Sequence, residues 1–255
     1  MTALATEPMP IPYVRQPEVR RQRMCGAAAL VMVYRYWAGV RYEPVQPPAE
    51  ANEAAAKDSP ISTPPLSQRD VLDCYMVWAR IATADGNGGR YARCHRLAAD
   101  LCHAGLDTAA IQAAEPWQAL QAAMEAGLPT IVNFRLSAES NLGHFAVVTA
   151  VGDDAICLHD PQFGPNRWLS RQQFLELWNV LPGGGETVGQ TMIVTACPPL
   201  RPASTMRWPV QDCPGCGRAF PYPPVRPLLA AIAGAFCPWC DRGWQLRLAD
   251  ESSSR

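Results

Sequence analysis

The sequence predicts an α+β fold, because helical patterns occupy the first half of the chain and strand patterns follow them. In residues 25–37, apolar side chains recur at spacings of three and four, as on the buried face of a helix. Short apolar runs bounded by turn residues then indicate strands at residues 130–135, 144–151, 155–160 and 191–196. We therefore expect helices packed on an antiparallel sheet.

The remaining elements follow from local signals. Ser67, as a helix N-cap, opens a helical pattern over residues 67–84, and Ser170 opens a short helix. Further helices are expected at residues 91–103 and 116–126. Residues 43–66 are rich in Pro, Ala and Glu without periodicity, so we expect an irregular insertion over the surface, and the glycines at 183–185 indicate a loop.

Charge and hydropathy exclude several classes of function. The 22 Lys and Arg residues nearly balance 23 Asp and Glu residues, and no basic stripe appears, so we expect neither a nucleic-acid nor an anionic membrane partner. Apolar runs are shorter than the ~20 residues that span a bilayer, and no signal-peptide pattern is present. We expect a cytoplasmic location, where the ten cysteines are free thiols or metal ligands.

Cys25 is a candidate nucleophile. It begins the first predicted helix, where unpaired N–H groups and the helix dipole favour a thiolate. His144 begins one strand and Asp160 ends the next, and a three-residue loop centred on Asp153 would pair Asp160 with Ala146. His144 and Asp160 then share one face of the hairpin, whereas a two-residue loop would reverse this parity.

A carboxylate beside an imidazole fixes the tautomer of the ring, and the second ring nitrogen can then take the proton of a thiol. Cys25, His144 and Asp160 would thus form a catalytic triad. The alternative from the residues alone is a half-buried histidine beside an ordinary Asp-Pro turn.

Four cysteines near the C-terminus indicate a metal site. Cys213-x-x-Cys216 and Cys237-x-x-Cys240 have the spacing of a structural site for one zinc ion, closed by four thiolates. Two redox pairs are the alternative reading. The Cys-His pairs at 94–95 and 102–103 lie about two helical turns, ~12 Å, apart, so we expect packing there and no shared metal.

Two segments resemble a known family. Residues 24–37, beginning Met-Cys-Gly-Ala-Ala-Ala, resemble the nucleophile helix of the C39-like, papain-fold cysteine peptidases, which include bacteriocin leader-processing enzymes of bacteria. Residues 143–148 and 159–164 resemble the histidine strand and Asp-Pro-x-x-Gly turn of that family, and the C-terminal cysteines resemble a zinc ribbon. The resemblance implies a papain-like fold with Cys25 as nucleophile, His144 as base and Asp160 as its orienting group.

The glutamine of the oxyanion hole is displaced relative to this family. It usually stands about six residues before the cysteine, where this chain has Val19. Gln16 and Gln22 are the candidates; Gln22 is too close to Cys25 to fold back over the thiolate, so we favour Gln16.

Together these features predict a cysteine peptidase that hydrolyses a peptide or protein substrate, with leader-peptide or Gly-Gly-type processing as the finer form. A catalytically silent peptide-binding or adaptor protein and an acyl-transferring or deamidating thiol enzyme are the alternatives.

For the domains we expect a peptidase domain at 1–198, a linker at 199–212, a zinc module at 213–248 and a disordered tail at 249–255. The zinc module is a candidate docking site for a protein partner, and few contacts should cross the linker. Truncation after Pro199 should then leave a folded protein that still labels at Cys25.

Overall fold

The computed structural model describes residues 7–19, 22–41, 72–84, 89–140, 142–179, 189–197 and 208–245. The expected insertion at 43–66, the helix start at Ser67, the glycines at 183–185 and the tail at 249–255 lie outside the described residues.

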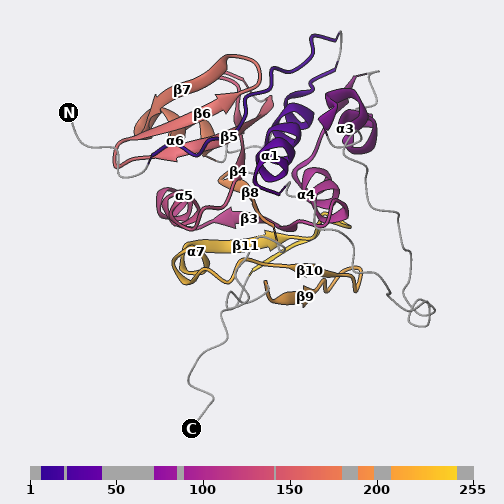
Figure 1. Ribbon diagram of the computed structural model, residues 1–255. Helices are drawn as coiled ribbons and strands as arrows, with labels where there is room; N and C mark the ends of the chain where they lie inside the picture. Colours follow the sequence, from indigo (N-terminus) through magenta and orange to yellow (C-terminus); the bar gives the residue numbers. More distant parts are fainter. Residues whose placement is uncertain are drawn as a thin grey trace.

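An antiparallel sheet of eight strands forms the centre of the described chain (Figure 1), in the order β12-β11-β3-β8-β4-β5-β6-β7. Its strands are β3 (Asp107–Ala113), β4 (Thr130–Arg135), β5 (Gly143–Val151), β6 (Ala155–Asp160), β7 (Gly164–Ser170), β8 (Thr191–Ala196), β11 (Ile232–Phe236) and β12 (Gly243–Gln245). Two hairpins lie outside it, made by β1 (Thr83–Ala84) with β2 (Arg90–Tyr91) and by β9 (Val210–Asp212) with β10 (Ala219–Pro221).

Helices cover both faces of the sheet (Figure 1). One face carries α1 (Cys25–Arg41), α3 (Cys74–Ile81) and α4 (Cys94–His103), and the other carries α5 (Pro116–Glu125), α6 (Arg171–Trp178) and α7 (Arg226–Ala230). Because successive strand residues point to opposite faces, neighbours divide between two cores: Val147 packs under α1, and Val148 packs under α5. The α+β class expected from the sequence is confirmed.

Local sequence sets the helix ends. Asp73 caps α3, its Oδ1 accepting hydrogen bonds from the backbone N–H groups of Tyr75 and Met76 at 2.7 and 3.2 Å. Ser170 and Gln173 form a capping box at the start of α6, so the short helix predicted after Ser170 is confirmed.

The C-terminal segment joins the central sheet. β11 pairs with β3, with Ala235 opposite Ile111 and Phe236 opposite Ala110. Residues of α7 and β11 complete the core under α5; the buried ones are Leu228, Ala231, Ile232 and Ala235. The expectation that few contacts cross the linker is therefore wrong, because a run of small apolar residues does not reveal which strand it pairs with. The domain boundaries themselves stay a prediction.

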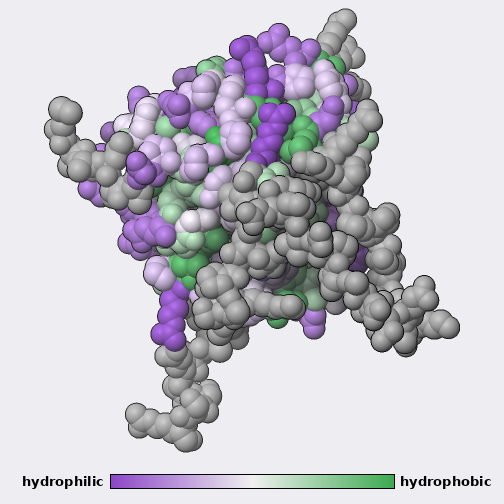
Figure 2. Space-filling view, in the orientation of Figure 1, coloured by the Kyte–Doolittle hydropathy of each residue, from purple (hydrophilic) through white to green (hydrophobic). Residues whose placement is uncertain are grey.

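The described surface in Figure 2 is mainly hydrophilic, with apolar residues in small groups. Large apolar side chains with more than two fifths of their area exposed include Phe163, Trp168 and Leu142, at 55%, 44% and 44%. None of the helices in the described ranges is long and apolar enough to cross a membrane.

Truncation after Pro199, which removes residues 200–255, should destabilise the rest of the chain, because it uncovers the edge of β3 and the core under α5. Burial of Leu228 and Ile232 alone contributes about 3 to 6 kcal/mol, which corresponds to a fall of roughly 6 to 24 °C in melting temperature for a chain of this size. Calorimetry of full-length and truncated protein measures the change. An unchanged melting temperature, with Cys25 still labelled, would support a separable module instead.

Candidate active site and metal centre

Cys25 is the first residue of α1, and it is 5% exposed. The next residue, Gly26, lets the helix approach its neighbours closely: a Cβ there would stand 3.3 Å from side-chain atoms of Ala92, Leu97 and Phe145. A larger residue would fit only if these side chains moved by a few tenths of an ångström. Cys25 is thereby held against the beginning of β5, where His144 precedes Phe145.

His144 and Asp160 face each other across β5 and β6. The imidazole Nε2 lies 2.7 Å from Asp160 Oδ1, and the two residues are 3% and 0% exposed. The remaining ring nitrogen is free to face Cys25, with which His144 shares a hydrogen bond. The structure thus brings together the three residues that the sequence singled out.

The turn between these strands differs from the expected one. Gly152 N donates to Ala155 O at 2.8 Å, which leaves a two-residue turn of Asp153 and Asp154 and not a three-residue loop. By itself this turn would place the side chains of His144 and Asp160 on opposite faces of the hairpin. A bulge between Val148 and Ala150 inserts one residue and returns them to one face, so that Val147 lies opposite His159. The expected three-residue loop is therefore wrong. His144 and Asp160 still face each other, because the shorter turn and the bulge each shift the strand register by one residue and the two shifts cancel.

Asp160 is fixed by several donors besides His144. Its Oδ1 accepts from the backbone N–H groups of Gln162 and Phe163 at 3.0 and 3.1 Å, and its Oδ2 accepts from Arg167 Nη1 at 2.7 Å. Sequence reasoning missed Arg167. Arg167 lies in β7 opposite Leu158, two residues before Asp160 and on the same face, and no sequence pattern had predicted this strand.

The charges of these groups are coupled. Burial raises the pKa of the Cys25 thiol, but the hydrogen bond and charge of His144 and backbone N–H groups outweigh burial and bring the pKa below its ordinary value. Burial lowers the pKa of His144, whereas its hydrogen bonds to Asp160 and Cys25 raise it, with a net rise to about 9. Burial also opposes ionisation of Asp160, yet the bond from His144 holds the pKa of that carboxyl low. The site favours thiolate and imidazolium at neutral pH.

Four other cysteines outside the four-cysteine cluster have thiol pKa values that are raised, in contrast to that of Cys25. Burial raises the pKa of Cys74 to about 11 and the pKa values of Cys94 and Cys102 to about 12. Burial likewise raises the pKa of Cys157. These thiols are protonated at neutral pH and are poor nucleophiles.

Gln16 and Gln22 lie in different surroundings. The backbone N–H of Gln16 donates to Pro161 O at 3.0 Å, so Gln16 lies beside the residue that follows Asp160. Its Oε1 is buried and has no hydrogen-bond partner in the described part of the chain. Gln22, by contrast, forms backbone bridges with Val19 and Arg90. These positions support the preference for Gln16, whose role stays a prediction.

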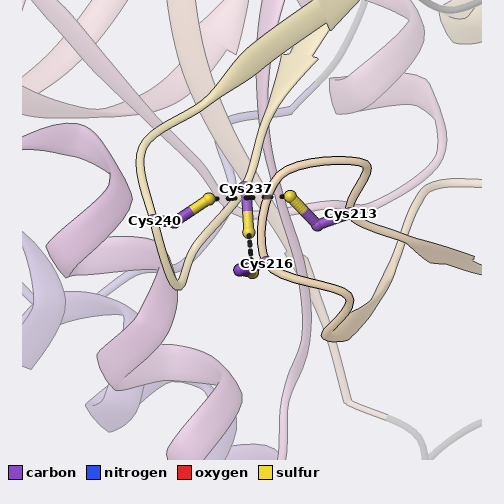
Figure 3. A group of neighbouring side chains, drawn as sticks. All are labelled: Cys213, Cys216, Cys237 and Cys240. Atoms are coloured by element: carbon purple, nitrogen blue, oxygen red, sulfur yellow. Dashed lines mark hydrogen bonds between the residues drawn. The ribbon is translucent and has the colours of Figure 1, made fainter.

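The four C-terminal cysteines converge on one point (Figure 3). Their sulfur atoms all lie within 4.8 Å of one another, with Cys213 3.6 Å from Cys240 and Cys216 3.7 Å from Cys237. A tetrahedral ion with metal–sulfur bonds of about 2.3 Å requires sulfur separations of about 3.8 Å. The cluster therefore has the donors and the size to bind a metal ion.

Two equivalent hairpin loops carry these cysteines. In the first, Cys213 N donates to Arg218 O and Gly217 N donates to Cys213 O; in the second, Cys237 N donates to Arg242 O and Asp241 N donates to Cys237 O. Gly217 and Asp241 both have positive φ, at 71° and 62°. The Sγ atoms of Cys213 and Cys237 each accept a backbone N–H at 3.3 and 3.4 Å, an arrangement that stabilises thiolates.

The second loop rests on α4. Asp241 pairs with His95 Nδ1 at 3.0 Å and with Arg93 at 3.5 Å, and the rings of Trp239 and His103 lie 5.0 Å apart. Both histidines of the Cys-His pairs thus contact the cysteine loop. The packing that the sequence predicted for these histidines is present in their contacts with Asp241 and Trp239.

Comparison with known proteins shows the family of the chain. Two solved structures resemble the fold. A double glycine motif protease from an AMS/PCAT transporter, in complex with the leader peptide, is 15% identical with a TM-score of 0.43, covering 75% of this chain and 95% of that chain. A protein assigned as a C39-like peptidase from Bacillus anthracis is 14% identical with a TM-score of 0.46, covering 74% and 95%. A search of curated proteins gave no match. The model of the Peptidase_C39 like family matches residues 9–185, and the chain belongs to this family.

Proposed function

We propose that the protein is a cysteine peptidase in which Cys25, His144 and Asp160 form the catalytic triad. The observation that carries this proposal is the buried hydrogen-bonded chain from the thiol at the start of α1 through His144 to Asp160. Family membership supports a peptidase-type function. The three groups supply the nucleophile, the base and the orienting group of thiol-dependent acyl transfer.

In the proposed reaction the Cys25 thiolate attacks the carbonyl carbon of the scissile peptide bond. A sulfur–carbon bond forms, and the carbonyl oxygen becomes an oxyanion. His144 then gives its proton to the leaving amine as the carbon–nitrogen bond breaks, and it accepts a proton from the water that hydrolyses the thioester. Asp160 keeps the ring oriented throughout, and its bonds to Arg167 and to backbone N–H groups keep it ionised.

The oxyanion needs donors at the position where its charge develops. The backbone N–H of Cys25, in the first turn of α1, is the proposed first donor, and the side-chain amide of Gln16 is the proposed second. The donor would be the Nε2–H of Gln16, and the backbone bond of Gln16 to Pro161 O, which places the residue beside the turn that follows Asp160, supports this role.

The low exposure of Cys25 and His144, 5% and 3%, favours small side chains next to the scissile bond. Gly-Gly-type cleavage, including processing of a leader peptide, is therefore the finer form of the proposal. A silent adaptor gains no support from this geometry, because such a protein needs no thiolate or imidazolium. Cleavage in ¹⁸O-labelled water separates hydrolysis, which labels the new carboxylate, from transfer to an amine.

For the four-cysteine cluster we propose one structural zinc ion held by Cys213, Cys216, Cys237 and Cys240. Four thiolates close the coordination shell and leave no position for a water molecule, so the ion would stabilise the two loops and take no part in hydrolysis. Through the contacts of Asp241 and Trp239 with α4, the second loop also supports the helical layer beside Cys25.

Iodoacetamide at pH 7 should alkylate Cys25 faster than any other thiol of the metal-loaded protein, because Cys25 has an imidazolium partner. Replacing His144 with Ala should slow this labelling about 10-fold or more, since the thiolate then loses its counter-ion. Peptide mapping by mass spectrometry measures both rates. His103→Ala is the matched control, and equal labelling of Cys25 and Cys157 would contradict the proposal.

Gln16→Ala should lower peptide turnover about 10²-fold, the scale for loss of one preorganised oxyanion donor. Gln22→Ala should change turnover much less, because Gln22 lies against Val19 and Arg90. Steady-state kinetics with a Gly-Gly-containing peptide compares the two variants. If Gln22→Ala is the sensitive variant, the assignment of the oxyanion donor is wrong.

Elemental analysis should find one zinc ion per chain, and Cys213→Ser or Cys240→Ser should abolish binding. Structural zinc sites contribute on the order of 10 kcal/mol to the folding of small modules, so a chelator should also lower the melting temperature. Cys102→Ser is the matched control, because Cys102 lies outside the cluster. Zinc retained by the Cys240→Ser variant, or absent from the intact chain, would refute the site.

A further inference from the structure

The N-terminal segment, residues 7–19, lies across β5 and β6 as an extended strap (Figure 1). Its attachment points follow one another in order. Met9 N donates to Thr149 O at 2.8 Å, His159 Nε2 lies 2.9 Å from Ile11 O, and Gln16 N donates to Pro161 O at 3.0 Å. The strap therefore runs from the bulge in β5 to the turn that follows Asp160, and Gln16 stands at its far end.

His159 is the one side chain of β6 that is hydrogen-bonded to this strap in the described residues. It is 7% exposed and points away from His144, as the alternation of β6 requires. Its Nδ1 accepts the backbone N–H of Asn166 at 3.2 Å, so the ring proton is on Nε2 and is donated to Ile11 O. The Tyr13 ring packs edge-on, with centroids 5.7 Å apart.

The contacts of His159 thus lock the strap to both β6 and the start of β7. Burial lowers the pKa of His159, so the ring is neutral at pH 7 and Nδ1 can accept. Between Ile11 and Gln16, the bond to the sheet that the described residues also make is the long one of 3.3 Å from the Tyr13 hydroxyl to Asp160 O. The anchor at His159 therefore helps to set the course of the strap up to Gln16, together with the bonds of Tyr13 and of Gln16 itself.

We propose that His159 is a positioning residue for the oxyanion donor: by fixing Ile11 it places the Gln16 amide for the reaction at Cys25. This inference rests on the proposed peptidase function and adds a residue that takes no part in the triad. A shift of about 1 Å in a catalytic group can cost about 10²-fold in rate. A strap that is no longer fixed at Ile11 would therefore slow catalysis without altering the Cys25–His144 pair.

Two reactions of Cys25 separate these effects. Iodoacetamide is attacked at a saturated carbon, iodide leaves, and no oxyanion forms. With p-nitrophenyl acetate the thiolate adds to the carbonyl, an oxyanion forms, and the bond to p-nitrophenolate breaks as the acetyl group moves to sulfur. Both reagents are small, so neither requires knowledge of the natural substrate. The rate of the Cys25→Ala variant is subtracted in each case.

His159→Phe keeps an aromatic ring against Tyr13 but removes the hydrogen bonds to Ile11 and Asn166. We expect it to lower Cys25-dependent acetylation about 10-fold or more, towards the level of Gln16→Ala, while the alkylation rate stays within about 2-fold. His159→Gln, which can still donate to Ile11 O, should recover much of the acetylation. In a Gln16→Ala background, His159→Phe should have no further effect on acetylation.

An unchanged acetylation rate in His159→Phe would overturn the inference, as would an equal fall in acetylation and alkylation, which indicates a general structural role. Additive losses in the double variant would place His159 and Gln16 in independent roles and would overturn it too. In all three cases the proposed function stands. If the intact chain and Cys25→Ala react equally with both reagents, the proposed function itself fails, and the inference falls with it.

Discussion

The buried hydrogen bond between His144 and Asp160 is the interaction on which the site depends. Without it, an imidazole that is 3% exposed would be neutral and unfixed, because burial alone disfavours its charge. With it, the ring can hold a proton beside Cys25 and stabilise a thiolate at the start of α1. Arg167 and two backbone N–H groups surround Asp160 in turn. The turn after β6 thus fixes the carboxylate of Asp160, the carboxylate fixes the imidazole of His144, and the imidazole stabilises the thiolate of Cys25.

The rest of the fold keeps these groups in place. Gly26 lets α1 approach β5 and α4 closely, and α4 in turn receives the cysteine loop through Asp241. β11 continues the same sheet on the far side of β3. The C-terminal segment is therefore part of the structure around the active site, and the proposed metal ion would stabilise that support at a distance from the reacting atoms.

Strong local patterns in the sequence predicted much of this structure. The strands at 130–135, 155–160 and 191–196 and the helix beginning at Cys25 form as expected, because their apolar periodicity matches their burial. The strands β3, β7 and β11 were not foreseen. β3 and β11 consist largely of small residues, and their pairing is decided by partners far away in the chain. The facing pair at the site was foreseen, but the compensating bulge at Thr149 was not, because a bulge depends on tertiary contacts such as the one from Met9.

The central claim is that Cys25 and His144 form a thiolate–imidazolium pair held by Asp160, and the ionisation of His144 tests it most directly. Heteronuclear NMR of labelled imidazole nitrogens can follow His144 from pH 5 to 10 in the intact chain and in Cys25→Ala. We expect His144 to be an imidazolium at pH 7 with a pKa of about 9 in the intact chain. In Cys25→Ala, which lacks the thiolate partner, we expect the pKa of His144 to be lower. A ring that is neutral at pH 7, and whose pKa is the same with and without Cys25, would contradict it.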